Sequence, residues 1–129
     1  MSNKIKPPEE WFKQADYDFW TAEAMLKTKR YIYAVFMCHL SIEKALKGLY
    51  TKYLDREPPK THNLIYLIEK IKLKPNEALY DFIFSLNRVS IPTRYPDDLD
   101  RMKKEYKKKI TENVLKETKE CLKWLKTKL

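Results

Sequence analysis

The chain contains a single glycine, Gly48, among its 129 residues. Tight β-hairpins, glycine-rich phosphate loops and nucleophile elbows depend on glycine, because it adopts positive φ and lets the backbone approach closely without steric cost. A dinucleotide-binding α/β sheet, a Walker-type NTPase and a compact β-barrel are therefore not expected. Helices remain as the building element.

The length fits one domain with one hydrophobic core. Hydrophobic residues make up 43% of the chain and aromatic residues 13%, so large rings are expected to fill much of that core. We predict a single domain over residues 1–129.

Apolar residues recur at helical spacing in several segments separated by proline or by capping residues. The first helix begins at Glu9 and Glu10 and carries the stripe Trp11, Ala15, Phe19, Ala22 and Leu26. The second, at about 31–53, is the most hydrophobic and is predicted to be central. We expect Thr61, Asn76 and Thr111 to cap the remaining helices. The pattern predicts an all-α fold, an antiparallel up-and-down bundle of four to five helices.

Two stretches are expected outside this bundle. Residues 1–8 end in Pro7-Pro8 and are predicted to form a frayed N-terminus. Residues 89–110 contain two prolines and then a run of lysines, and are predicted to form a basic loop or linker before the last helix.

The formal net charge is +9, from 27 Lys and Arg against 18 Asp and Glu. Such an excess favours polyanionic partners such as RNA or nucleotide phosphates. It is equally typical of the Lys/Glu-rich solvated surfaces of thermophile proteins, and the single glutamine, Gln14, fits such a source. The basic run 101–109 allows the same two interpretations.

The cysteines and histidines limit the chemistry further. Cys38 and Cys121 fall on apolar helical faces and are expected to be buried free thiols. No signal peptide and no apolar run of membrane-spanning length is found, so a cytoplasmic protein without membrane contact is expected. With only two histidines and no ligand spacing typical of zinc, no metal site is predicted.

His39 and Glu43 stand one turn apart beside the apolar stripe of the second helix, with Tyr50 on the same flank. Such a pair can line a cleft and contact a ligand. It can equally be a buried imidazole oriented by its neighbouring carboxylate. Both interpretations remain open.

A longer string carries a family resemblance. It runs Tyr31-x2-Ala34-x-Phe36-x2-His39-x3-Glu43-Lys44-x-Leu46-Lys47, then Pro59-Lys60-Thr61-His62-x-Leu64, then Arg94-Tyr95-Pro96-Asp97. In order and spacing this resembles the HEPN domain (higher eukaryotes and prokaryotes nucleotide-binding domain), over roughly residues 9–128.

The resemblance implies a helical bundle that forms homodimers and binds nucleotides or RNA. It also implies a partner, a minimal nucleotidyltransferase, in a two-component or toxin–antitoxin pair. No cofactor is implied beyond a bound nucleotide such as ATP. Many members are metal-independent ribonucleases with an Arg-x4-6-His motif, in which histidine exchanges protons and arginine stabilises the charge of the transition state.

This sequence departs from the ribonuclease motif. Arg88 matches its arginine, but Thr93 stands where histidine is expected, and threonine does not titrate near neutral pH. Arg56 and His62 have the right spacing but lie in the loop after the second helix. His62, Arg56 and His39 are therefore catalytic candidates only for an alternative function as a ribonuclease.

A binding set remains. Arg88 and Arg94 can contact phosphate, and Tyr95 can stack on a base. Further candidates come from the second helix: His39, Glu43 and Lys47. Arg94 could instead pair with Asp97 or Asp98 and fix the loop. In the family, the tyrosine at the place of Tyr95 can also accept a nucleotide from the partner.

The sequence thus favours a nucleotide- or RNA-binding module that acts with a nucleotidyltransferase. The alternative is a ribonuclease toxin that cleaves RNA without metal. A helical adaptor with neither activity is the third possibility.

Overall fold

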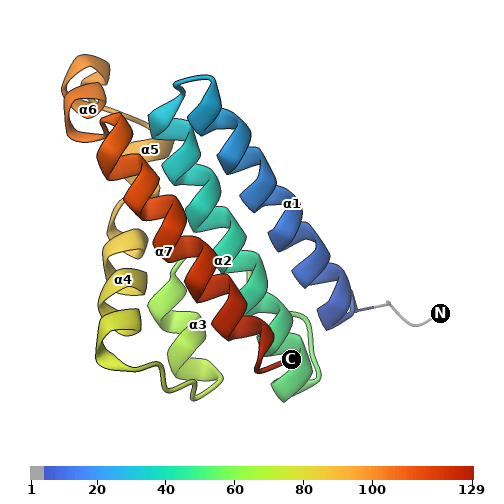
Figure 1. The fold of residues 1–129 in the computed structure, drawn as a ribbon. Helices are drawn as coiled ribbons and strands as arrows, with labels where there is room; N and C mark the ends of the chain where they lie inside the picture. Colours follow the sequence, from blue (N-terminus) through green and yellow to red (C-terminus); the bar gives the residue numbers. More distant parts are fainter. Residues whose placement is uncertain (1–4) are drawn as a thin grey trace.

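The structure is a computed structural model that describes residues 5–129, and within this range it contains helices and no strand, which confirms the all-α prediction. Three long helices run along the molecule: α1 (Pro8–Lys27), α2 (Tyr31–Leu54) and α7 (Lys108–Lys126) (Figure 1). Four short helices complete it: α3 (Leu64–Lys70), α4 (Glu77–Arg88), α5 (Ser90–Arg94) and α6 (Leu99–Glu105). The five expected helices are present, and two short ones are added.

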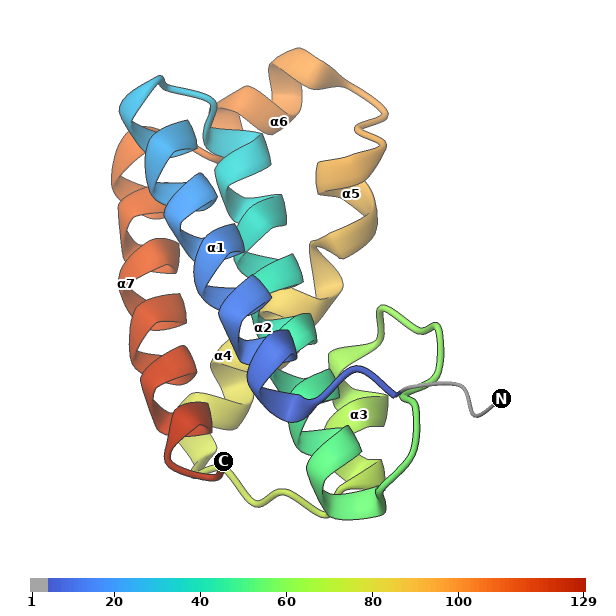
Figure 2. The ribbon, with the colours of Figure 1, turned by 90° about the vertical axis from the view of Figure 1, so that its right-hand side faces the viewer.

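Helix α2 is the centre of the bundle, as predicted. It contacts all six other helices, and α1 and α7 lie along it while α3 covers its C-terminal end (Figure 2). Because neighbours cover most of its sides, it buries polar residues beside its apolar ones. The buried polar and charged side chains of α2 are His39, Ser41, Glu43, Lys47 and Thr51.

Helices α1 and α2 form an antiparallel pair with small residues in their contact. Ala15 and Ala45 are fully buried, and the Ser41 hydroxyl donates a 2.8 Å hydrogen bond to the carbonyl oxygen of Ala15. A Cβ on Gly48 would lie 3.0 Å from the ring of Phe12. The one glycine therefore permits close helix packing. The left-handed turn between the helices is made by Lys29, at φ 63°.

The caps of the helices agree only in part with the sequence-based expectation. Asn76 caps α4 as predicted, accepting a 2.8 Å hydrogen bond from the backbone N–H of Leu79. Thr61 does not cap α3; Asn63 does. Thr111 does not cap α7, which begins one turn earlier; its hydroxyl donates to the carbonyl oxygen of Lys107 instead.

The prediction of a loop or linker over 89–110 is wrong for most of that segment. Helix α5 forms although it contains Pro92, because proline in the first helical turn costs no internal hydrogen bond. Helix α6 is capped by Asp98, which accepts from the backbone N–H of Arg101. Buried side chains, Thr93 in α5 and Met102 in α6, fix both against the bundle.

Part of the predicted frayed N-terminus, residues 1–4, lies outside the described residues; residues 5–7 have no regular structure, and Pro8 already belongs to α1. Cys38 and Cys121 are buried free thiols, as predicted, and burial raises the pKa of each to about 12. Among the described helices, none combines the length and apolarity needed to cross a membrane.

Candidate functional site

Glu43 is the centre of a polar cluster on the face of α2. Its side chain is 4% exposed, yet both carboxylate oxygens have partners. Oε1 lies 2.8 Å from Nδ1 of His62, and Oε2 accepts a 3.1 Å hydrogen bond from Nζ of Lys47. These contacts offset the cost of burying the carboxylate, which would be several kcal/mol if it stood alone.

His62 reaches this cluster from the loop that precedes α3. The loop is held on its other side by two asparagines: Asn63 caps α3, and Asn87 of α4 accepts a 2.7 Å hydrogen bond from the backbone N–H of Leu64. The side chain of His62 is 55% exposed, so the imidazole lies between the buried carboxylate and solvent.

Arg94, at the end of α5, completes the cluster from a third direction. Its guanidinium carbon lies 4.8 Å from the centre of the Phe36 ring, at cation–π distance. Its Nη2 lies 3.4 Å from Nδ1 of His62. Its buried Nε has no hydrogen-bond partner. The guanidinium is therefore oriented by a ring while much of its donor capacity stays free.

His39 lies beneath these groups and is fully buried. Its Nδ1 is 3.9 Å from Glu43, and neither ring nitrogen has a hydrogen-bond partner of normal geometry. Burial lowers the pKa of His39 to about 4. The carboxylate of Glu43 and the backbone of His62 raise this pKa, and the positive charge of Arg94 lowers it further. A neutral imidazole oriented next to Glu43 is the second of the two interpretations drawn from the sequence, and a ligand could not touch it without rearrangement.

The contacts of Glu43 determine what His62 can do. The 2.8 Å contact to a carboxylate places a proton on Nδ1 of His62, so the more distant Arg94 is a neighbour of that nitrogen and not its donor. In the neutral imidazole, Nε2 then carries the free lone pair. An exposed imidazole with this tautomer can accept a proton at Nε2, and the neighbouring guanidinium can donate hydrogen bonds to a phosphate.

Among the described residues, no hydrogen bond or ion pair joins Thr93, Arg56 or Arg88 to this cluster, whereas Tyr95 directly follows Arg94 in the chain. Thr93 is fully buried and its hydroxyl donates a 2.6 Å hydrogen bond to the carbonyl oxygen of Val89, so the position of the motif histidine faces the interior. No hydrogen bond or ion pair within residues 5–129 joins Arg56 to His62. Burial raises the pKa of the Tyr106 hydroxyl, and the positive charge of the nearby Arg88 lowers it in part. Tyr95 is 75% exposed beside Arg94.

The alternative pairing of Arg94 with Asp97 or Asp98 is not found among the described residues. Arg94 contacts Phe36 and His62, and Asp98 is used to cap α6. Sequence reasoning missed the role of Phe36 and the meeting of His62 with Glu43 and Arg94. One indication of this site was present in the sequence: Phe36, Glu43, His62 and Arg94 all belong to the motifs that resemble the HEPN domain.

No group of three or more His, Cys, Asp or Glu side chains within the described part of the chain is arranged to hold a metal ion. Arg94 and Lys47 bring two cations to the cluster, against the single carboxylate of Glu43.

Comparison with known proteins adds the family. The family model described as HEPN domain matches residues 8–128. Among solved structures, TT1696 from Thermus thermophilus is 27% identical, with a TM-score of 0.80, 95% of this chain and 98% of that chain being covered. An archaeal HEPN homologue, ST0689, is 25% identical with a TM-score of 0.76 and the same coverage. No curated protein matches. The chain belongs to the HEPN domain family.

Proposed function

We propose that this protein is a nucleotide- or RNA-binding HEPN module that works with a minimal nucleotidyltransferase, in a two-component or toxin–antitoxin pair. The observation that carries the binding proposal is the guanidinium of Arg94, placed over Phe36 with free donors and next to the exposed imidazole of His62. A guanidinium with free donors suits a phosphate, which accepts paired hydrogen bonds.

The neighbouring residues suit the rest of a nucleotide. Tyr95 follows Arg94 in the chain and is exposed, so its ring is available for a base to stack on. Lys47 adds a positive charge at the inner side of the cluster, although Glu43 neutralises it in part. Arg88 remains a candidate for a more distant phosphate of an RNA strand.

Fluorescence anisotropy with a labelled single-stranded oligoribonucleotide tests this proposal. Arg94→Ala should weaken binding roughly tenfold, since charge-assisted hydrogen bonds contribute about 1.5–3 kcal/mol. Arg101→Ala removes the same charge from an exposed arginine that pairs with Glu105, and should change the affinity less than about twofold. Equal effects of the two substitutions would mean that only net charge matters, and would contradict a site at Arg94.

The partner gives a second test. If the nucleotidyltransferase modifies this chain, the hydroxyl oxygen of Tyr95 attacks the α-phosphorus of a nucleoside triphosphate. Pyrophosphate leaves, and the hydroxyl proton passes to a base of the partner. Intact-mass spectrometry after incubation with partner and ATP should then show one added nucleotide, and Tyr95→Phe should show none. An unchanged mass of the unsubstituted protein would remove this part of the proposal.

A second function, RNA cleavage, is favoured by one specific contact, that of His62 with Glu43. With Nδ1 donating to the carboxylate, Nε2 of His62 can take the proton of a ribose 2′-hydroxyl. The 2′-oxygen attacks the adjacent phosphorus and the 5′-oxygen leaves, while Arg94 stabilises the negative charge on the phosphoryl oxygens. The leaving 5′-oxygen takes up a proton from solvent, so the products are a 2′,3′-cyclic phosphate and a fragment with a free 5′-hydroxyl.

Incubation of the purified protein with RNA in EDTA separates the two functions. Binding without cleavage supports the module. Cleavage that is retained in EDTA and lost in both His62→Ala and Glu43→Gln supports the ribonuclease. Arg56→Ala is the matched control, because Arg56 and His62 have the spacing of the ribonuclease motif. This substitution should leave any cleavage unchanged.

A further inference from the structure

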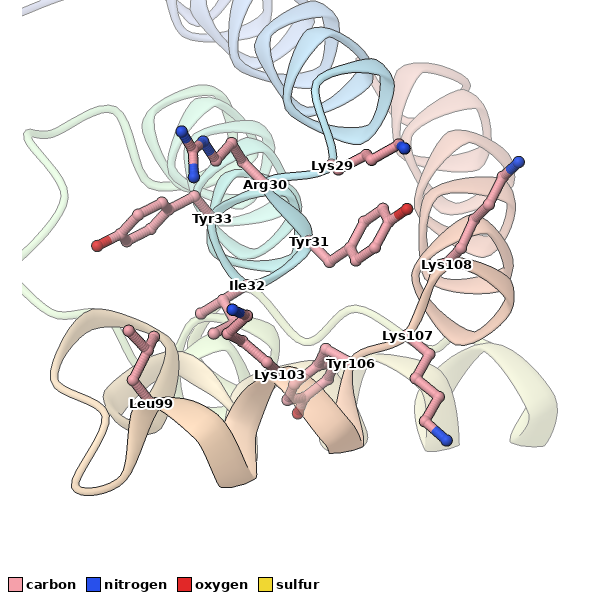
Figure 3. Close-up of a pocket in the computed structure, with 10 residues that line it drawn as sticks. All are labelled: Lys29, Arg30, Tyr31, Ile32, Tyr33, Leu99, Lys103, Tyr106, Lys107 and Lys108. Carbon is pink, nitrogen blue, oxygen red and sulfur yellow. The ribbon is translucent and has the colours of Figure 1, made fainter.

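A second basic feature lies at the opposite end of α2 from its contact with α3. A cavity of about 580 Å³ opens between the α1–α2 turn, helix α6 and the start of α7 (Figure 3). Its volume falls within the range of small-molecule sites. Its lining residues are Lys29, Arg30, Tyr31, Ile32, Tyr33, Leu99, Lys103, Tyr106, Lys107 and Lys108.

This cavity is distinct from the cluster around His62. The two share no residue, although Phe36, on which the Arg94 guanidinium lies, follows the lining residue Ile32 by four positions, about one helical turn along α2. A ligand of this cavity therefore does not depend on the proposed function.

The charge of the lining is one-sided. Five of the ten residues are Lys or Arg, and none is acidic. Among the described residues, none of these five cations takes part in an ion pair, whereas Lys44, Lys47 and Lys126 elsewhere in the bundle each contact a carboxylate. An unpaired cluster of like charges around one concave space lowers stability unless an anion occupies it.

The backbone adds to this positive potential. The N-termini of two long helices, α2 and α7, meet at the cavity. Neither has a side-chain cap, and neither has an acidic residue in its first turn, whereas α1 has Glu9 and Glu10 and α4 has Glu77. A lysine at the positive end of a helix dipole is repelled by that end, which lowers stability. An anion bound there would instead be attracted to it and would raise stability.

The remaining lining residues are apolar or aromatic. Ile32 and Leu99 supply aliphatic surface, and three tyrosines supply rings. In Figure 3, Lys103 extends from α6 toward Ile32, and Tyr31 points toward the side on which Lys29 and Lys108 lie, while Lys107 points away. Cations next to rings suit a ligand with several phosphate charges on a flat or apolar body.

We propose that this cavity binds a small molecule that carries several phosphates on a flat organic group. Lys29, Lys103 and Lys108 contact the phosphates, and Tyr31 and Ile32 contact the organic group. The affinity should rise with the number of phosphates and fall with added salt.

Isothermal titration calorimetry with three probes tests the assignment: ATP, inorganic tripolyphosphate and adenosine. In Arg94→Ala, which removes the other proposed nucleotide contact, ATP should bind saturably at one site, tripolyphosphate more weakly and adenosine not measurably. Equal affinities for ATP and tripolyphosphate would overturn the role given to the rings. Absence of saturable binding by both anions would overturn the site.

Two matched pairs of substitutions locate the binding. Lys103→Ala and Lys108→Ala should each weaken ATP binding roughly tenfold, as the loss of a charge-assisted hydrogen bond does. Lys104→Ala and Lys109→Ala remove the same charge one residue away from the lining, and should change it less than about twofold. All four side chains are exposed, so these variants should fold. Equal effects in all four would show unspecific attraction and overturn the proposal.

Two further measurements keep this site separate from the cluster around Arg94. ATP binding should persist in Arg94→Ala, and its loss there would overturn the assignment to the cavity. An oligoribonucleotide without terminal phosphates should not displace ATP. Displacement that also depends on Lys103 would make this surface a contact for RNA backbone, and would overturn a small-molecule site.

Discussion

At the residue scale, the polar cluster on α2 combines a buried group that has hydrogen-bond partners with a buried group that has none. Glu43 is buried but has a partner for each oxygen, whereas His39 is buried with none for either nitrogen. A buried polar group without a partner lowers stability by about 1–3 kcal/mol. The fold tolerates this cost next to its candidate site.

The depressed pKa of His39 predicts a pH dependence of stability. The unfolded chain takes up a proton on this imidazole near pH 6.5, whereas the folded chain does so only near its pKa of about 4. Protons therefore favour the unfolded state in this window. The contribution of neutral His39 is fully present above pH 6.5 and is lost as the pH falls toward 4, by about 3 kcal/mol.

Urea unfolding at a series of pH values measures this effect. His39→Gln removes the titrating group at similar volume, so the free energy of unfolding of the original protein should fall more steeply than that of the variant between pH 6.5 and 4. Parallel curves for the two proteins would contradict a depressed pKa.

At the element scale, the pairing of α1 with α2 depends on the absence of a side chain at Gly48. Alanine in a helix is favoured over glycine by about 1 kcal/mol. Here its Cβ would lie 3.0 Å from the Phe12 ring and from Cβ of Trp11, and Phe12 is buried. Overpacking of this kind costs about 1–3 kcal/mol.

Gly48→Ala should therefore lower the melting temperature in spite of the better helix propensity. Thermal unfolding followed by circular dichroism at 222 nm measures it. A second variant, Gly48→Ala with Phe12→Leu, should recover part of the loss by removing ring atoms from the contact. A melting temperature that rises in the single variant would contradict the close packing.

The sequence could predict some of the helices and caps, and missed others. The long helices follow from their apolar periodicity, and the start of α4 follows from Asn76 after a proline. The expected caps at Thr61 and Thr111 were wrong because a threonine hydroxyl can also bond to nearby backbone, as Thr111 does with the carbonyl of Lys107. Helices α5 and α6 could not be predicted from local composition, since burial of Thr93 and Met102 against the bundle stabilises them.

At the scale of the whole molecule, the candidate site is assembled from parts that are distant in the chain. Nineteen positions separate His62 from Glu43, and thirty-two separate it from Arg94. Helical periodicity relates residues three or four positions apart and carries no information on such contacts. The sequence could thus identify the residues, through the family resemblance, but not their arrangement.

The exposed surface also bears on the homodimer that the family resemblance implies. Several large apolar side chains on α4, α5 and α6 are exposed: Tyr80, Phe84, Ile91 and Leu99. Exposed apolar side chains favour an interface where they form a contiguous patch. Sedimentation velocity should show a dimer that Ile91→Glu shifts toward monomer. Trp20→Glu, at an exposed ring on α1, is the control and should leave the dimer intact. A monomer at all concentrations would contradict the expected dimer.

The central claim is that nucleic acid binds where Arg94 and His62 meet, and nuclear magnetic resonance tests it most directly. An unlabelled oligoribonucleotide without terminal phosphates is added to ¹⁵N-labelled protein, and the signals of the Arg94 Nε–H and the His62 imidazole are followed. Both should shift progressively and saturate together, while the Arg101 Nε–H should stay in place. Saturable binding of the RNA that leaves the Arg94 and His62 signals unmoved would contradict the account.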